Sequence, residues 1–172
     1  MSYHEDTVVQ MGRTLRNLRA LLDKAAEFAR ARGAEPDCFI GVRLHADMRP
    51  FEFQIQAVCD AAKFAAARLA GVEPPKNPDT EKTLDELRAR IDATLAFLDG
   101  LDASQFDGAG EREVAISFLP GKAAYGADYL REFVLPNFYF HATTAYALLR
   151  HAGVQVGKRD FITHLTLHDA AK

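Results

Sequence analysis

The sequence has no cluster of basic residues. Its 172 residues include 21 lysines and arginines against 24 aspartates and glutamates, which gives a formal net charge of -3. Proteins that bind nucleic acids carry basic patches that neutralise phosphates, whereas the basic side chains here are scattered among acidic ones. The composition therefore gives no support for a nucleic-acid partner.

Long hydrophobic runs and cysteines are also scarce. No stretch approaches the roughly 20 apolar residues of a membrane-spanning helix, so we expect no membrane contact. The first residues, Met1 to Asp6, are too polar and acidic for a secretory signal. The two cysteines, Cys38 and Cys59, lie far apart, and Cys59 falls off the centre of an apolar stripe, so we expect partial exposure. We therefore expect a cytoplasmic protein with reduced thiols.

The remaining composition is that of an ordinary globular protein. Hydrophobic residues make up 48% and charged residues 26% of the chain, and its length suits one domain over residues 1–172 with a sizeable core. Four segments repeat apolar residues at steps of three and four, two of them in strict alternation, which is the pattern of a helix with one buried face. They predict helices over about residues 4–32, 48–70, 84–101 and 126–152.

Local signals locate some helix ends. Asp47 stands where an N-cap of the second helix would stand. Thr80 or Thr83 can cap the third helix, and Thr83 with Glu86 has the capping-box spacing. The proline-rich segment 71–78 cannot be helical and predicts a connecting loop.

A break at residues 107–110 separates the third and fourth helices. Residues 113–118 then alternate in the manner of a strand, and Pro120-Gly121 is a turn signal, so we expect a small β-hairpin. The fold class is therefore all-α, a four-helix bundle with a hairpin between helices three and four. Two chain orders stay open, a simple up-down meander and an up-down-down-up order with crossover loops.

Seven residues, 135–141, form the strongest candidate for a site. They combine three aromatic residues with Pro136, Asn137 and His141 and run directly into an apolar helix. Pro136 either opens this helix or bends it. His141 is either an imidazole at the edge of the core, hydrogen-bonded by a neighbour, or a side chain that overlooks a cavity. The candidate pocket residues are His141, Asn137, Tyr146, Gln54 and Asp47.

Short motifs across nearly the whole chain follow the order found in a known family. They are Arg43-Leu44, Asp47-Met48-Arg49-Pro50, Gln54, Arg68-Leu69-Ala70-Gly71, Asp79 with Glu81, Thr83 and Leu87, Pro136 to His141, Ala145-Tyr146, Leu149-Arg150, and Gly157-Lys158 with Asp160. In these motifs the chain resembles an uncharacterised bacterial family of the DinB/YfiT-like four-helix-bundle superfamily. The resemblance implies the bundle fold. It also implies relatives that hold a divalent metal, some of which act as thiol transferases or hydrolases.

The superfamily's metal site uses three histidines, one from the second helix and two spaced four apart on the fourth. His141 matches the first of that pair, but Ala145 stands at the second position and the second helix has no histidine. A reduced set of His141, His45 and Asp47 would remain for zinc, nickel or iron if the helix ends meet. The other interpretation places His45 in solvent and Asp47 at a helix cap.

Three hypotheses about function follow. The first is a bundle protein, a homodimer, that binds a small ligand or a partner in a pocket near His141. The second is a metal-dependent transferase or hydrolase with the reduced His/Asp set, in which the metal polarises a substrate or activates a thiol or water. The third is structural assembly through an outward alanine-rich or aromatic face. The sequence names no substrate and leaves open whether the protein is an enzyme.

Overall fold

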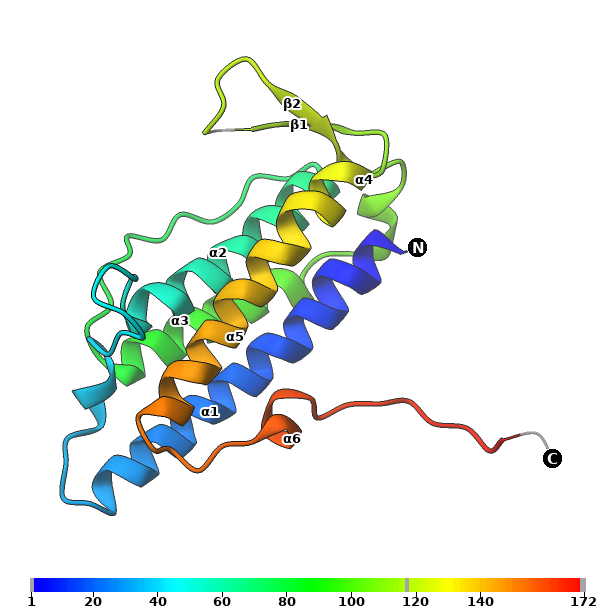
Figure 1. Cartoon of the computed structure of the whole chain (residues 1–172). Coiled ribbons are helices and arrows are strands. Elements are labelled where there is room, and N and C mark those ends of the chain that lie inside the picture. The colour runs from blue at the N-terminus through cyan, green and yellow to red at the C-terminus, as the bar shows by residue number, and fades with distance from the viewer. Residues whose placement is uncertain (1, 117, 171–172) are drawn as a thin grey trace.

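The computed structural model describes residues 2–116 and 118–170 as an elongated helical bundle (Figure 1). This confirms the expected mostly helical fold with a small hairpin. The long helices are α1 (Gly12–Arg30), α2 (Phe51–Ala70), α3 (Leu84–Asp99) and α5 (Leu135–His151). The shorter elements are π-helical segments at Glu5–Met11 and Tyr129–Val134, 3-10 turns at Pro36–Phe39 and Ala103–Phe106, strands β1 (Glu113–Ala115) and β2 (Ala123–Tyr125), α4 (Gly126–Asp128) and α6 (Lys158–Phe161).

The chain order is up-down-down-up. Helices α2 and α3 run in the same direction, so the segment between them, residues 71–83, returns along the length of the bundle (Figure 1). We call this segment the crossover. Helix α1 runs against α3, since Arg16 near the start of α1 pairs with Asp99 at the end of α3 at 2.7 Å. The meander is therefore excluded, and the bundle has α1 and α5 parallel to each other.

The apolar faces of the four helices meet in one core. Phe51 of α2 and Phe138 of α5 are the largest side chains that are fully buried. Helix α2 packs between α3 and α5, and its alanines at 62, 65, 66 and 67 are completely buried. Because alanine has so small a side chain, α2 approaches both neighbours closely. No helix among residues 2–116 and 118–170 is long and apolar enough to cross a membrane.

The third helix begins as predicted and the second does not. Thr83 accepts from the Glu86 N–H, and the Glu86 carboxylate accepts from the Thr83 N–H, both at 3.1 Å, which completes the capping box. Helix α2 instead follows Pro50 without a side-chain cap. Asp47 lies in the preceding loop, where its carboxylate pairs with His45 at 2.6 Å, so its predicted capping role is wrong.

The last helix contains a wider turn before its proline. The helical run starts at Gly126, passes through the π-helical segment Tyr129–Val134 and continues as α5, where Pro136 is the second residue. A proline has no N–H and crowds the carbonyl four residues earlier, which here belongs to Glu132. A π-turn relieves that crowding and rotates the residues before it relative to those after it. Pro136 thus opens α5 within a longer helix.

The hairpin is tied closely to the bundle. Its two strands are antiparallel, with Val114 opposite Ala124. Gly126, directly after β2, lies so near the chain that an added Cβ would stand 2.0 Å from the carbonyl oxygen of Ala109, and only glycine permits this approach. Beyond β1, Phe118 reaches back to α5's side of the bundle and packs on Phe133, with 5.2 Å between ring centroids. Ser117, which the strand prediction included, lies outside the described residues.

Candidate functional site

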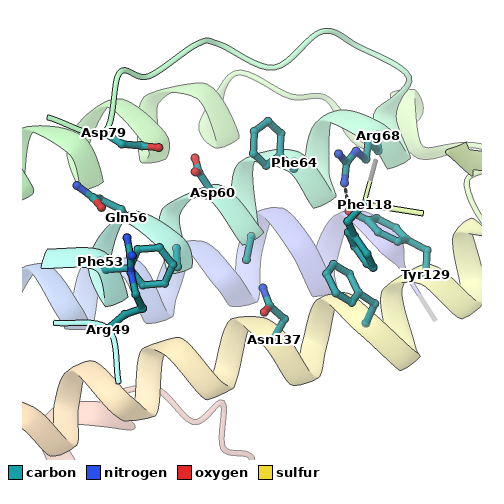
Figure 2. Close-up of a pocket in the computed structure, with 13 residues that line it drawn as sticks. Arg49, Phe53, Gln56, Asp60, Phe64, Arg68, Asp79, Phe118, Tyr129 and Asn137 are labelled. Atoms are coloured by element: carbon teal, nitrogen blue, oxygen red, sulfur yellow. Dashed lines mark hydrogen bonds between the residues drawn. The ribbon is translucent and has the colours of Figure 1, made fainter. Parts of the chain in front are cut away.

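A groove of about 630 Å³ lies between α2 and the last helix (Figure 2). We call it the α2–α5 groove. One wall is a face of α2 on which Phe53, Ala57, Ala61, Phe64 and Arg68 follow one another at steps of four, four, three and four. This spacing repeats every helical turn, so the residues form a second stripe beside the one that enters the core.

The opposite wall comes from the π-helical segment and the first turn of α5. Tyr129, Phe133 and Asn137 are spaced four apart and line the groove. The rings of Tyr129 and Phe133 stack with their centroids 6.0 Å apart. Phe118 from the hairpin and Asp79 from the crossover lie at the rim (Figure 2). The groove therefore draws on four parts of the chain that are distant in sequence.

At one end of the groove, Arg68 donates a hydrogen bond to the hydroxyl oxygen of Tyr129 at 2.6 Å (Figure 2). Its guanidinium carbon lies 5.2 Å from the Phe64 ring centroid and 5.6 Å from that of Tyr129. Cation–π contacts of this kind hold the guanidinium in place without neutralising its charge. Among the described residues, no carboxylate forms an ion pair with Arg68.

The opposite end carries a second arginine. Arg49, from the loop before α2, places its guanidinium 4.3 Å from the centroid of Phe53 (Figure 2). Its side chain is exposed, and it forms no ion pair with a carboxylate of the described residues. Each end of the groove thus has a cation resting on an aromatic ring.

The two acidic residues that line the groove, Asp60 and Asp79, form ion pairs with an arginine of α3. Arg90 of α3, with only 1% of its side chain exposed, donates to Asp60 at 2.8 Å, to Asp79 at 2.8 Å and to Glu81 at 2.9 Å. Burial acts to lower the pKa of Arg90, but these bonds and the carboxylate charges outweigh burial and raise it. Arg90 is therefore a permanent cation that fixes the crossover to α2 and α3.

Lys63 is a second buried cation beside the ion pairs of Arg90, and we call these residues together the Arg90 cluster. Lys63 is 3% exposed in its side chain and pairs with Asp60 at 2.7 Å, while it also donates to the Asn77 amide oxygen at 2.6 Å. Gln56 donates to Glu81 at 3.0 Å. Buried charges are tolerated only when they are paired and hydrogen-bonded, and here the pairing spans both helices and the crossover.

Of the residues predicted for a pocket, Asn137 lines the groove and His141 lies one helical turn beyond it. The His141 ring packs edge-on against the groove residue Phe53, at 5.9 Å between centroids. Buried Gln54 uses its amide nitrogen to donate to the Arg49 carbonyl, so its amide oxygen accepts from Nδ1 of His141 at 2.8 Å. Burial lowers the pKa of His141 below its ordinary value. A neutral imidazole therefore supports the groove wall from outside, protonated at Nδ1.

Tyr146 and Asp47 lie elsewhere. Tyr146 packs edge-on against Phe161 of α6, with 5.8 Å between centroids, and Asp47 is exposed beside His45. Among the described residues, no group of three or more His, Cys, Asp or Glu side chains is placed to hold a metal. The structure therefore does not assemble His141, His45 and Asp47 into the reduced metal set.

Cys59 is completely buried, so the expectation of partial exposure is wrong. It lies on the side of α2 that faces α3, beside Thr94 and the Arg90 cluster. Burial raises the pKa of the Cys59 thiol to about 12. Cys38, in contrast, is exposed.

Comparison with known proteins agrees with this fold. The sequence matches a family described as a domain of unknown function, DUF1993, over residues 3–162. The chain belongs to the DUF1993 family. A crystal structure of a DinB family member from Shewanella denitrificans is 39% identical to this DUF1993 chain, with a TM-score of 0.91, and the match covers 98% of this chain and 95% of that one. None of the curated proteins matches the sequence.

These matches confirm the resemblance to an uncharacterised DinB-like bundle family. The groove residues Phe53, Phe64 and Tyr129 were not among the predicted site residues. Their signal was present on α2, because Phe53, Ala57, Ala61 and Phe64 follow helical spacing. The stronger core stripe of the same helix concealed it.

Proposed function

We propose that this DUF1993 protein binds a small organic molecule in the α2–α5 groove. Ligand sites are concave, mostly apolar and typically about 300–1,000 Å³ in volume, with a few polar groups that fix orientation. The groove has a volume of about 630 Å³, aromatic walls and polar side chains near its ends. This combination is the observation that carries the proposal.

The chemistry of the walls favours a flat or flexible apolar body. Phe53, Phe64 and Phe133 offer ring faces and edges, and Ala57 and Ala61 leave space between them. Burying such a body against aromatic walls contributes roughly 25 cal/mol per Å² of apolar surface removed from water. Binding of this kind fits the first hypothesis from the sequence, with the site moved from His141 itself to the groove that His141 supports.

The experiment fills the groove from within. Ala61 lies on the α2 wall and is only partly buried, so Ala61→Phe adds a ring that projects into the ligand space. Ala96→Phe is the matched control. Ala96 is exposed on α3, so this substitution adds the same ring outside the groove. A library of small amphipathic molecules is tested by ligand-detected NMR against both variants and the unaltered protein.

We expect ligands that bind the unaltered protein and Ala96→Phe but lose binding to Ala61→Phe by about tenfold or more, since a filled cavity leaves no room for the ligand body. Binding that is equal in all three proteins would contradict a site in the groove.

The homodimer and the cytoplasmic location stay predictions. Sedimentation velocity checks the oligomeric state, and cell fractionation checks the location.

A further inference from the structure

One end of the groove has hydrogen-bond donors that lack an acceptor among residues 2–116 and 118–170. Arg68 donates one N–H to Tyr129. Because arginine cannot accept a hydrogen bond, the Tyr129 oxygen is the acceptor. The hydroxyl proton of Tyr129 is then left over, together with the other N–H groups of Arg68. Among the described residues, neither Arg68 nor the Tyr129 hydroxyl has a second side-chain hydrogen-bond partner. A ligand group that only accepts hydrogen bonds would satisfy both.

The groove's acidic side chains do not meet this demand. Asp60 is held by Arg90 and Lys63, and Asp79 by Arg90, at 2.7–2.8 Å. Figure 2 shows Asp79 at the far end of the groove from Arg68, on the side of Arg49. Among the described residues, no carboxylate therefore forms an ion pair with Arg68.

From this placement we infer that the Arg68–Tyr129 end of the groove binds the carboxylate of an amphipathic ligand whose apolar body lies along Phe64 and Phe133. This inference rests on the proposed function. A planar guanidinium fork matches the two oxygens of a planar carboxylate, and the Tyr129 hydroxyl adds a third donor. A phosphate monoester carries up to two negative charges, and among the described residues that line the groove Arg68 is the one cation at this end, so a phosphate fits less well.

The test uses matched sets of ligands. Phenylbutyrate and octanoate are each compared with their primary amide and their amine, and octyl phosphate is added as the other anion. Binding to the full chain is measured by isothermal titration calorimetry and ligand-detected NMR at fixed, low salt. We expect each carboxylate to bind about tenfold more tightly than its amide, the usual gain from a charge-assisted hydrogen bond.

Variants identify the anchoring residues. Arg68→Gln should abolish the preference of the protein for the carboxylate over the amide, and Arg68→Lys should restore part of it, because it keeps the charge and loses the fork. Tyr129→Phe should reduce the preference by roughly threefold, through the loss of one donor. Arg150→Gln is the control, since Arg150 is exposed on α5 outside the groove. Thermal unfolding verifies that each variant folds, and Tyr129→Phe carries the test should Arg68→Gln not fold.

Each other outcome overturns a defined part of the argument. Amides that bind as tightly as acids, or a preference for the amines or for octyl phosphate, would overturn the carboxylate site and leave a groove that binds ligands. A preference that vanishes in Arg49→Gln and persists in Arg68→Gln would overturn its location. If no acid, amide or amine binds but the library screen finds other ligands for the unaltered protein, this inference fails and the proposed function stands. If the screen of the unaltered protein also finds no ligand, the proposed function fails and this inference with it.

Discussion

Arg90 is buried behind the groove among the carboxylates of Asp60, Asp79 and Glu81, whereas Arg68 lies at one end of the groove with a tyrosine hydroxyl as its hydrogen-bond partner. Both arginines are held within hydrogen-bond distance of their partners. Carboxylates neutralise the charge of Arg90, whereas no carboxylate in the described part of the chain pairs with Arg68. The difference separates an ion cluster that holds the fold together from a cation that is available to a ligand.

The largest effect that this comparison predicts is the loss of Arg90. Arg90→Ala leaves the carboxylates facing it without their buried cation, so it should lower the free energy of unfolding by about 3–5 kcal/mol in urea denaturation. The control is Arg16→Ala, which removes an exposed pair whose side chains are 49% and 54% accessible and should cost less than about 1 kcal/mol. Equal losses in the two variants would erase the distinction between a buried cluster and a surface pair.

The second prediction concerns how tightly the Arg90 side of α2 is closed. In the native protein, iodoacetamide should modify exposed Cys38 and spare Cys59, whose thiol is buried with its pKa raised to about 12. A thiol with that pKa has on the order of a thousandfold less thiolate than an ordinary one at neutral pH. Peptide mass spectrometry over time gives both rates. In Arg90→Ala the Cys59 rate should increase, and an unchanged rate would mean that the cluster does not close this side.

A smaller effect is expected on the groove side. Tyr129→Phe removes only the acceptor of one Arg68 N–H, and that N–H can turn to water, so the free energy of unfolding should fall by about 1 kcal/mol or less. Urea denaturation under the conditions used for Arg90→Ala makes the comparison direct. A loss of several kcal/mol would place the Arg68–Tyr129 pair with the structural cluster.

The smallest predicted effect is a pH dependence from His141. Burial lowers its pKa in the folded chain from the ordinary value of 6.5, so the unfolded chain binds more protons as the pH falls below that value. The contribution of His141 to stability is therefore complete above pH 6.5 and is lost as the pH falls through the folded pKa. The unaltered protein should lose more stability than His141→Gln between neutral pH and pH 5, measured by urea denaturation across a pH series. A steeper loss in the variant would reverse the sign.

The bundle itself was predictable because helical periodicity and capping chemistry are local. The apolar stripes, the Thr83–Glu86 capping box and the hairpin signal at Pro120-Gly121 all depend on residues a few positions apart, and the structure confirms them. The chain order was not predictable in this way. It depends on where the crossover travels, which the periodicity of the helices does not encode.

Most of the groove could not be predicted either, because its walls come from segments that are distant in the sequence. Asn137 was predicted, but its partners across the groove belong to a second stripe of α2 that the core stripe outweighed. Asp47 was misassigned because its sequence position suits an N-cap while the chain bends away before α2 begins. Arg90 lies on the amphipathic helix α3, where its burial could not be predicted from the sequence. Its burial is explained by the carboxylates that α2 and the crossover bring to it.

The parallel course of α2 and α3 obliges the crossover to span the bundle, and on the way it delivers Asp79 to the rim of the groove. Changes in the composition or length of residues 71–78 can therefore reshape one edge of the cavity while every helix keeps its neighbours. On the proposed function, such changes in the crossover would alter which ligands the groove accepts.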